Sequence, residues 1–179
     1  MSTPADAISI RPATPADVPL VLSFIRELAL YERLGAQVSA SEADLATALF
    51  GPRPYAEVVF ACLEGTPVGF ALFFHNFSTF LGKPGIYLED LFVRPQARGR
   101  GVGRRLLQWL ARTTLARGGA RLDWAVLDWN APAIGFYRSL GAVALDEWTT
   151  YRLSGAALAG LAGERGASAP DGDTRHRSS

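Results

Sequence analysis

The sequence predicts one α+β domain, a twisted and mostly antiparallel sheet flanked by helices. Strand-like segments in the first half are joined by a short turn, which favours antiparallel pairing. The second half then alternates strand and helix. A length of 179 residues, of which 49% are hydrophobic, is enough for one sizeable core.

The first expected elements are a strand and two helices. Residues 8–12 alternate apolar and polar side chains, as a half-buried strand does. Thr14 is a capping residue and Pro15 suits a first turn, so a helix is expected to begin there. A second cap at Ser41 predicts a short helix that ends near Phe50. The buried face of the first helix is predicted from its helical spacing: Val18, Leu22, Ile25, Leu28 and Ala29.

Three strands are expected next. Residues 57–63 and 68–75 are strand-like, and the turn at 64–67 predicts an antiparallel hairpin. Residues 85–93 form another apolar strand, which contains two adjacent carboxylates, Glu89 and Asp90. Neighbouring side chains of a regular strand point to opposite faces, so these two are expected on opposite sides of the sheet.

The second half is expected to alternate helix and strand. Glycines end its two longer helices, at 118–119 and at 141, and Asn130 caps the second of them. The expected elements are helices over 103–117, 130–140 and 154–161, and strands over 121–127, 143–145 and 148–153.

One domain is expected over residues 8–162. Residues 1–7 are polar, and we expect them to be flexible. Residues 163–179 contain almost no large apolar side chain and are rich in Gly, Ser, Asp and Arg, so we expect a disordered tail there.

The composition argues against several classes of partner. The formal net charge is +1, which gives no indication of a nucleic-acid or membrane partner. The single cysteine, Cys62, lies in an apolar run, so a disulfide framework is excluded and a small buried side chain is expected. No apolar run approaches membrane-spanning length, and no signal peptide is apparent. We expect a soluble, cytoplasmic protein that uses no metal.

The most informative segment is residues 93–104, Val-Arg-Pro-Gln-Ala-Arg-Gly-Arg-Gly-Val-Gly-Arg, here called the glycine-rich loop. Its three alternating glycines, Gly99, Gly101 and Gly103, let backbone N–H groups approach a ligand closely. Because the loop lies between a predicted strand and an amphipathic helix, it meets the free N–H groups and positive dipole end of that helix. A pyrophosphate group is the ligand expected at this loop.

Other phosphate-binding loops fit less well. A nucleoside-triphosphate loop requires Gly-Lys-Ser/Thr at the helix start, whereas residues 103–105 read Gly-Arg-Arg. The dinucleotide fingerprint requires a third glycine three residues after its second, whereas these glycines are two residues apart and lie mid-chain. A flexible glycine turn with solvated arginines is the remaining alternative.

Two motifs carry a family resemblance. Arg98-x-x-Gly101-x-Gly103 resembles the acetyl-CoA signature of the GNAT acetyltransferase superfamily, and residues 130–141, Asn-Ala-Pro-Ala-Ile-Gly-Phe-Tyr-Arg-Ser-Leu-Gly, resemble its second signature. The resemblance covers residues 8–153 and implies a GNAT-like fold, acetyl-CoA as co-substrate and an amine as acceptor. Further segments look most like the branch that holds the spermidine/spermine and thialysine acetyltransferases, namely residues 10–14, 27–29, 31–32, 87–90 and 129–130.

Acetyl transfer needs a neutral amine and a protonated leaving group. An alkylammonium with a pKa of about 10.4 is neutral in roughly one molecule per thousand near pH 7.4, a cost of about 4 kcal/mol. A carboxylate can accept its proton, directly or through water. The resemblance implies that Glu89 is this carboxylate and that Tyr137 is the general acid for the CoA thiolate. The alternatives are a surface carboxylate and a core aromatic residue.

The resemblance also implies the binding residues. The backbone of Leu91, Phe92 and Val93 would contact the pantetheine amides, and an N–H there would polarise the acetyl carbonyl. Further cofactor-binding residues would be Arg98, Gly99, Arg100, Gly101, Val102, Gly103, Arg104, Asn130, Ile134 and Tyr137. The acceptor-binding residues would be Tyr31, Glu32, Ser78, Thr79, Glu89, Asp123, Trp124 and Ala125. Among these, packing is the alternative role for Tyr31 and Trp124, and solvated charge for Glu32 and Asp123.

The acceptor is expected to be a thialysine-like or lysine-like side-chain amine, with diamines and polyamines as alternatives. The polyamine enzymes carry two extra acidic residues where this chain has Gly35-Ala36, and segments 31–34, 77–80 and 125–130 look more like the thialysine branch. The hydroxyl groups of Ser78 and Thr79 suit an amino-acid head group.

Two other classes of function stay open. A protein or peptide N-acetyltransferase usually needs an open groove, whereas residues 77–84 are expected to form a loop over the acceptor site. A non-catalytic acyl-CoA-binding regulatory module would not need both Glu89 and Tyr137. The resemblance further implies a homodimer and direct transfer in a ternary complex.

Overall fold

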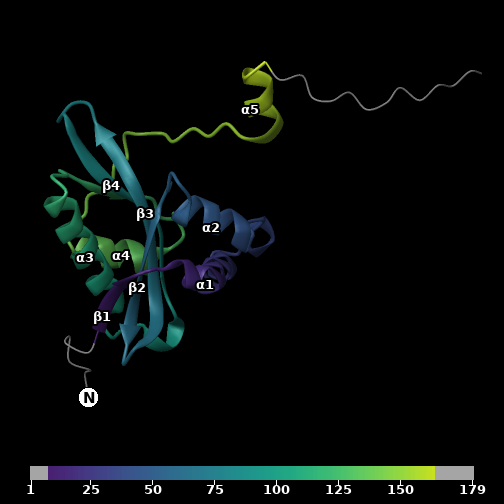
Figure 1. Ribbon diagram of the computed structural model, residues 1–179. Helices are drawn as coiled ribbons and strands as arrows, with labels where there is room; N and C mark the ends of the chain where they lie inside the picture. The colour runs from purple at the N-terminus through teal and green to yellow at the C-terminus, as the bar shows by residue number, and fades with distance from the viewer. Residues whose placement is uncertain (1–7, 164–179) are drawn as a thin grey trace, which may run out of the picture. The chain divides into compact units, whose positions relative to one another are not determined.

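The computed structural model describes residues 8–163, and the chain divides after Asp128 into two compact units. The predicted flexible segment 1–7 and residues 164–179 of the predicted tail lie outside the described residues. The first unit holds the sheet and helices α1 to α3, and the second holds α4 and α5 (Figure 1). In the described part of the chain, no helix is long and apolar enough to span a membrane.

The sheet has the order β1-β2-β3-β4-β5. Its first three pairings are antiparallel and only β4 and β5 are parallel, so the predicted mixed, mostly antiparallel fold class is confirmed. The strands are β1 (Ile8–Pro12), β2 (Glu57–Leu63), β3 (Thr66–Ser78), β4 (Lys83–Val93) and β5 (Leu122–Trp124).

The turn between β2 and β3 is shorter than the sequence suggested. Leu63 pairs with Thr66, which leaves only Glu64 and Gly65 in the turn. Both have positive φ, 50° and 80°, as a two-residue hairpin turn with primed geometry requires. The predicted hairpin is confirmed, and β3 begins two residues earlier than expected.

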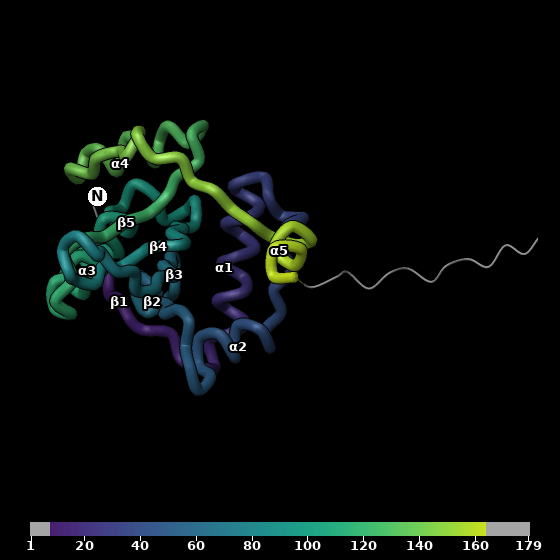
Figure 2. The backbone as a smooth tube through the Cα atoms, turned by 90° about the horizontal axis from the view of Figure 1, so that it is seen from above, coloured from purple at the N-terminus to yellow at the C-terminus, as the bar shows by residue number. Residues whose placement is uncertain are grey.

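Helices cover both faces of the sheet, with α1 and α2 on one side and α3 on the other (Figure 2). Thr14 donates its backbone N–H and its hydroxyl to Asp17, and the short 3-10 turn Pro15–Asp17 leads into α1. The helices of this unit are α1 (Val18–Tyr31), α2 (Glu42–Phe50) and α3 (Val102–Ala116).

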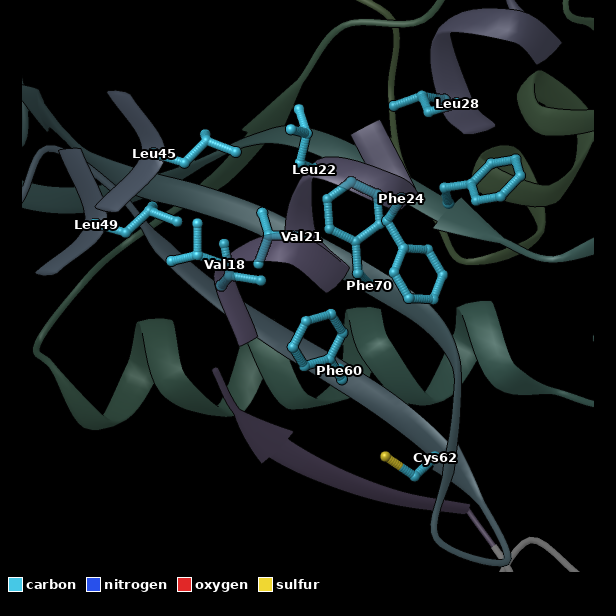
Figure 3. Close-up of a cluster of buried hydrophobic side chains, with 12 residues drawn as sticks. Val18, Val21, Leu22, Phe24, Leu28, Leu45, Leu49, Phe60, Cys62 and Phe70 are labelled. Atoms are coloured by element: carbon cyan, nitrogen blue, oxygen red, sulfur yellow. The ribbon is translucent and has the colours of Figure 1, made fainter. Parts of the chain in front are cut away.

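The main core lies between α1, α2 and the sheet (Figure 3). Phe24 is its centre, with ring centroids 5.7 Å from Phe60, 5.2 Å from Phe70 and 6.5 Å from Phe92. The prediction for Cys62 is confirmed, because this side chain is only 2% exposed within the same cluster. Phe92 extends the core towards the end of α1, where its ring lies 6.3 Å from that of Tyr31.

The segment expected as a loop over residues 77–84 is instead the end of a hairpin. β3 continues to Ser78 and β4 starts at Lys83, so only residues 79–82 connect the two strands. The apolar side chains at this end are exposed, Phe80 by 95%. The expectation of a loop was wrong because the strand pairing continues through Phe77 and Pro84.

The second unit contains α4 (Ala131–Ser139) and α5 (Gly155–Leu161), both of which the sequence predicted. The two strands predicted over 143–145 and 148–153 are wrong, since the described residues of this unit contain no strand. An alternation of apolar and polar side chains shows that a segment can form a strand, but a strand also needs a partner strand for its N–H and C=O groups. Among the described residues of the unit no strand pairs with this segment, and its side chains are exposed, Trp148 by 73% and Tyr151 by 89%.

Candidate active site

The glycine-rich loop has the backbone geometry that its sequence predicted. After the 3-10 turn Pro95–Ala97, the chain passes through Gly99 and Gly101, whose φ angles are 71° and 84°. Side-chain-bearing residues adopt this left-handed region at a cost of roughly 1–2 kcal/mol, so glycine is favoured at both positions. Gly101 is the N-cap of α3, which begins at Val102.

The loop also leaves space for a ligand. A Cβ atom added at Gly99 or Gly101 would meet nothing within 4 Å, so these glycines are not explained by close packing inside the protein. No side chain caps α3, and its first turn contains no acidic residue. The N–H groups of that turn are therefore available to an anion, and the residues present fit the pyrophosphate of a CoA molecule.

A β-bulge lies next to this loop, in β4. Leu72 pairs with Asp90 and Phe73 pairs with Leu88, so Glu89 has no partner in the register. A bulge breaks the alternation of faces, and the expectation that Glu89 and Asp90 lie on opposite faces assumed a regular strand. The register places Asp90 opposite Leu72, which packs against the core on the α1 side.

The parallel ladder between β4 and β5 ends at the same point. Its last pair is Leu88 and Trp124, directly before the bulge. The strand predicted over 121–127 is therefore only three residues long. Beyond Leu88, β4 is paired with β3 alone, so the outer backbone edge of Leu91–Val93 has no neighbouring strand in the described part of the chain. This open edge fits the predicted contact with pantetheine amides.

Where α1 ends against β4, the charges of Glu32 and Glu89 both act on the carboxyl group of Asp90. Burial, followed by the charges of Glu89 and of Glu32, raises the pKa of Asp90 to about 6. Burial also raises the pKa of Glu32, which directly follows Tyr31 at the C-terminal end of α1. Glu89 is exposed and Asp90 is half-buried. We call Tyr31, Glu32, Glu89 and Asp90 the acceptor wall.

The glycine-rich loop contacts this wall through Arg98. Its guanidinium lies over the ring of Tyr31, 4.6 Å from the centroid, and 5.5 Å from the ring centroid of Phe92. Its Nε donates to the carbonyl of Val93 at 2.9 Å. The side chain of Arg98 is thus folded towards α1, and the predicted cofactor and acceptor residues adjoin here.

An ion pair holds the start of the loop to α1. Arg94 donates to both carboxylate oxygens of Glu27, from Nε at 2.9 Å and from Nη2 at 2.7 Å. Its guanidinium also lies 4.3 Å from the centroid of the Phe24 ring. The hydrogen bonds from Arg94 lower the pKa of Glu27 despite its partial burial. This contact fixes the strand-to-loop junction against the core.

Asp123, a predicted acceptor residue, is already paired within the sheet. Its Oδ2 accepts from Nδ2 of Asn76 at 2.8 Å and forms an ion pair with Nε of Arg121 at 2.8 Å. Trp124 is half-buried beside Leu88, and Ala125 follows it at the end of the ladder, adjacent to the bulge. The register therefore brings Trp124 and Ala125 near Glu89, and the acceptor role of the paired Asp123 stays a prediction.

Ser78 and Thr79 are not brought to the acceptor wall. Ser78 pairs with Lys83, six residues before Glu89 along β4, a separation of about 20 Å in an extended strand. The Ser78 side chain is buried and its hydroxyl accepts from the Leu81 N–H at 3.3 Å. One amino-acid substrate cannot span from these hydroxyls to Glu89 within a single chain.

The remaining predicted residues lie in the second unit. Asn130 caps α4 as expected, since its side chain accepts from the N–H of Ala133 at 3.3 Å. Ile134 and Tyr137 are half-buried residues of α4, and the Tyr137 ring lies 5.5 Å from that of Phe136. The cofactor role of these three residues stays a prediction from the second signature.

Sequence reasoning missed Asp90 and Arg94 as residues of the site. Asp90 was visible as a charge inside an apolar strand, but only the bulge and the end of α1 show which carboxylates are its neighbours. Arg94 was read as part of the loop, and no local pattern connects it to Glu27, 67 residues earlier. No group of three metal-ligating side chains occurs among residues 8–163.

Comparison with known proteins agrees with this geometry. Residues 24–142 match the model of the acetyltransferase (GNAT) family. A thialysine N-epsilon-acetyltransferase of Bos taurus is 38% identical, over 88% of this chain and 98% of its own. An L-ornithine N5-acetyltransferase of Arabidopsis thaliana is 34% identical, over 83% and 85%.

Solved structures give the same result. An integron cassette protein from the mobile metagenome of V. cholerae superposes with a TM-score of 0.74 and 31% identity, over 87% of this chain and 98% of that one. Since the family model covers well over half of the sequence, the chain belongs to the GNAT family and is an N-acetyltransferase.

Proposed function

We propose that this enzyme transfers the acetyl group of acetyl-CoA to the side-chain amine of a small amino acid of the thialysine, ornithine or lysine type. The observation that carries the proposal is the acceptor wall beside the glycine-rich loop. It combines three carboxylates, Glu32, Glu89 and Asp90, with an aromatic ring, Tyr31. Such a wall attracts one ammonium group and packs against its aliphatic stem.

In this proposal the chain's backbone holds the cofactor. The N–H groups from Gly99 to Arg104 bind the pyrophosphate, and the open edge of Leu91–Val93 binds the pantetheine arm. Support comes from the two positive φ angles, the open space above them and the end of the β5 ladder. When bound, acetyl-CoA supplies the acetyl group as a reactive thioester.

The carboxylates prepare the amine. Glu89 and Asp90 hold the ammonium group and accept its proton, either directly or through water. Asp90 is suited to this task because its pKa of about 6 leaves it ionised at neutral pH yet closer in basicity to the amine than an ordinary carboxylate. In a direct transfer within a ternary complex, the neutral amine would form the N–C bond to the acetyl carbon, and the thioester C–S bond would break with release of the CoA thiolate.

Tyr137 is proposed as the proton donor to the departing thiolate. This role rests on the signature of residues 130–141, in which Tyr137 follows Phe136 on the helix capped by Asn130. A homodimer is proposed on the same resemblance, and light scattering of the purified protein tests it.

An amino acid is favoured over a polyamine by the relatives. Two similar proteins act, by their names, on thialysine and on L-ornithine, each of which has a single side-chain amine. Where polyamine enzymes carry further acidic residues after α1, this chain has Gly35 and Ala36.

A thiol-release assay over thialysine, ornithine, lysine, putrescine and spermidine tests the proposal. We expect the highest kcat/KM for one of the three amino acids. A preference for spermidine or putrescine would overturn the acceptor assignment, and absence of thiol release with every amine would overturn the activity on small amines. Mass spectrometry of peptides treated in parallel separates a protein-modifying enzyme from both.

A further inference from the structure

The side chain of Arg98 links the glycine-rich loop, which is proposed to bind the cofactor, to the acceptor wall, which is proposed to bind the amine. Its backbone belongs to the glycine-rich loop, whereas its guanidinium lies 4.6 Å from the ring centroid of Tyr31 on the acceptor wall. A second ring, that of Phe92, lies 5.5 Å from the same guanidinium. The hydrogen bond from Nε to the Val93 carbonyl fixes the direction of the side chain.

Tyr31 needs such a support because of where it lies. It is the last residue of α1, and the chain leaves the helix through Glu32 and through Arg33, whose φ is 63°. Tyr31 is about one-third exposed. On the sheet side, the centroid of the Phe92 ring lies 6.3 Å from the centroid of the Tyr31 ring. Arg98 contacts the same ring from the loop, so the sheet and the loop both restrict its orientation.

We propose that Arg98 is a positioning residue that couples the glycine-rich loop to Tyr31, so that the conformation of the cofactor loop sets the shape of the acceptor wall. This inference rests on the proposed function. A flat guanidinium can stack on a ring and donate from Nε at the same time, whereas a lysine ammonium cannot do both. The role therefore depends on arginine and not on positive charge alone.

The contact between Arg98 and the two aromatic rings can be detected by NMR in the ligand-free protein, without any measurement of turnover. The δ protons of an arginine placed over two aromatic rings are shifted upfield by the ring currents, and the hydrogen bond slows exchange of its Nε proton. We expect both effects for Arg98 in the NMR spectrum without ligands. The Tyr31→Leu variant should lose most of the upfield shift and keep the fold.

Kinetics then test the coupling itself through a double-mutant cycle. At saturating acetyl-CoA, Arg98→Lys should lower kcat/KM for the amine about tenfold, the loss expected from one cation–π contact and one hydrogen bond. In a Tyr31→Leu background the same change should cost less than about twofold, because the ring it positions is gone. Arg104→Lys is the matched control, since Arg104 lies on the first turn of α3 and makes none of the contacts described for Arg98.

The effects of Arg104→Lys and Tyr31→Leu should multiply independently, and Arg104→Lys should leave the Arg98 resonances in place. If the effects of Arg98→Lys and Tyr31→Leu also multiply independently in an active enzyme, the positioning role is overturned while the proposed function stands. An ordinary chemical shift for the Arg98 δ protons overturns it as well. A wild-type protein that acetylates no amine overturns the proposed function, and this role with it.

Discussion

The cofactor side and the acceptor side of the proposed site use different kinds of chemical group for binding. On the cofactor side, the groups proposed to bind are backbone N–H and C=O groups, exposed by two glycines with positive φ and by the open edge of β4. On the acceptor side they are charged side chains, brought together by the end of α1 and the bulge at Glu89. Arg98 contacts both, through the Val93 carbonyl on the cofactor side and the Tyr31 ring on the acceptor side. Substitutions should therefore separate binding of the cofactor from activation of the amine.

The largest effect is expected at the acceptor wall. Asp90→Asn should lower kcat/KM for the amine about a hundredfold or more, because one of the two proposed proton acceptors is lost. The wild-type kcat/KM should rise with pH through about 6 as Asp90 ionises, and this limb should be absent from the Asp90→Asn profile. If the pH profile of Asp90→Asn still rises through about 6, the rise must be caused by the ionisation of another group.

The same substitution should make the protein more stable. A carboxyl whose folded pKa is raised opposes folding once it is ionised, so the cost is present above pH 6 and disappears as pH falls below about 4. Asp90→Asn should raise the free energy of unfolding at pH 8 by about 1–2 kcal/mol, less than the full shift implies because the carboxylate is only half-buried. Urea unfolding at pH 8 and pH 4 measures this difference.

The next effect is expected at the proposed general acid. Tyr137→Phe should lower kcat about ten- to a hundredfold, because the thiolate departs without its proton donor. The dissociation constant of acetyl-CoA, measured by calorimetry, should change by less than about threefold. Equal losses of turnover and of acetyl-CoA affinity would exclude a general-acid role for Tyr137 and would indicate a packing role instead.

A smaller effect, confined to the cofactor, is expected at the loop. Gly101→Val should weaken acetyl-CoA binding at least about tenfold, because a side chain occupies the open space and strains a residue at φ 84°. Gly118→Val is the matched control, since Gly118 has φ 74° and equally open surroundings at the other end of α3. Both variants should lose similar stability, and equal loss of affinity in both would mean that the phosphates bind elsewhere.

The smallest effect is expected at the ion pair behind the loop. Glu27→Gln should lower the free energy of unfolding at pH 7 by about 1 kcal/mol, since the pair with Arg94 is partly exposed. The pKa of Glu27 is lowered in the folded state, so this contribution is present above the unfolded pKa and is lost as pH falls through the folded one. The difference in unfolding free energy between wild type and variant should therefore be smaller at pH 3 than at pH 7.

The contrast between the two sides also explains what the sequence could predict. Backbone sites leave local patterns, and the spacing of Gly99, Gly101 and Gly103 was sufficient to predict the loop and the start of α3. Charged sites depend on which distant elements meet. The bulge that isolates Glu89 is a property of the pairing between β3 and β4, and no sequence pattern within β4 reveals it.

Strands were predicted less well than helices for a related reason. Caps and glycines mark helix ends locally, as Asn130 and Ser41 show. A strand exists only where a partner exists, so β5 ends where its ladder with β4 ends, and the apolar alternation over 143–153 forms no strand within its unit. The position of Ser78 relative to Glu89 likewise depends on the register between β3 and β4, which pairs Ser78 with Lys83, six residues before Glu89.

Titration calorimetry of the wild-type protein with acetyl-CoA tests the central claim most directly, because every proposed step requires that the backbone of the glycine-rich loop holds this molecule. The account predicts saturable heat with one site per chain, and a binding curve that weakens in Gly101→Val but not in Gly118→Val. Absence of any binding heat to the folded wild-type protein, at several temperatures, would contradict it.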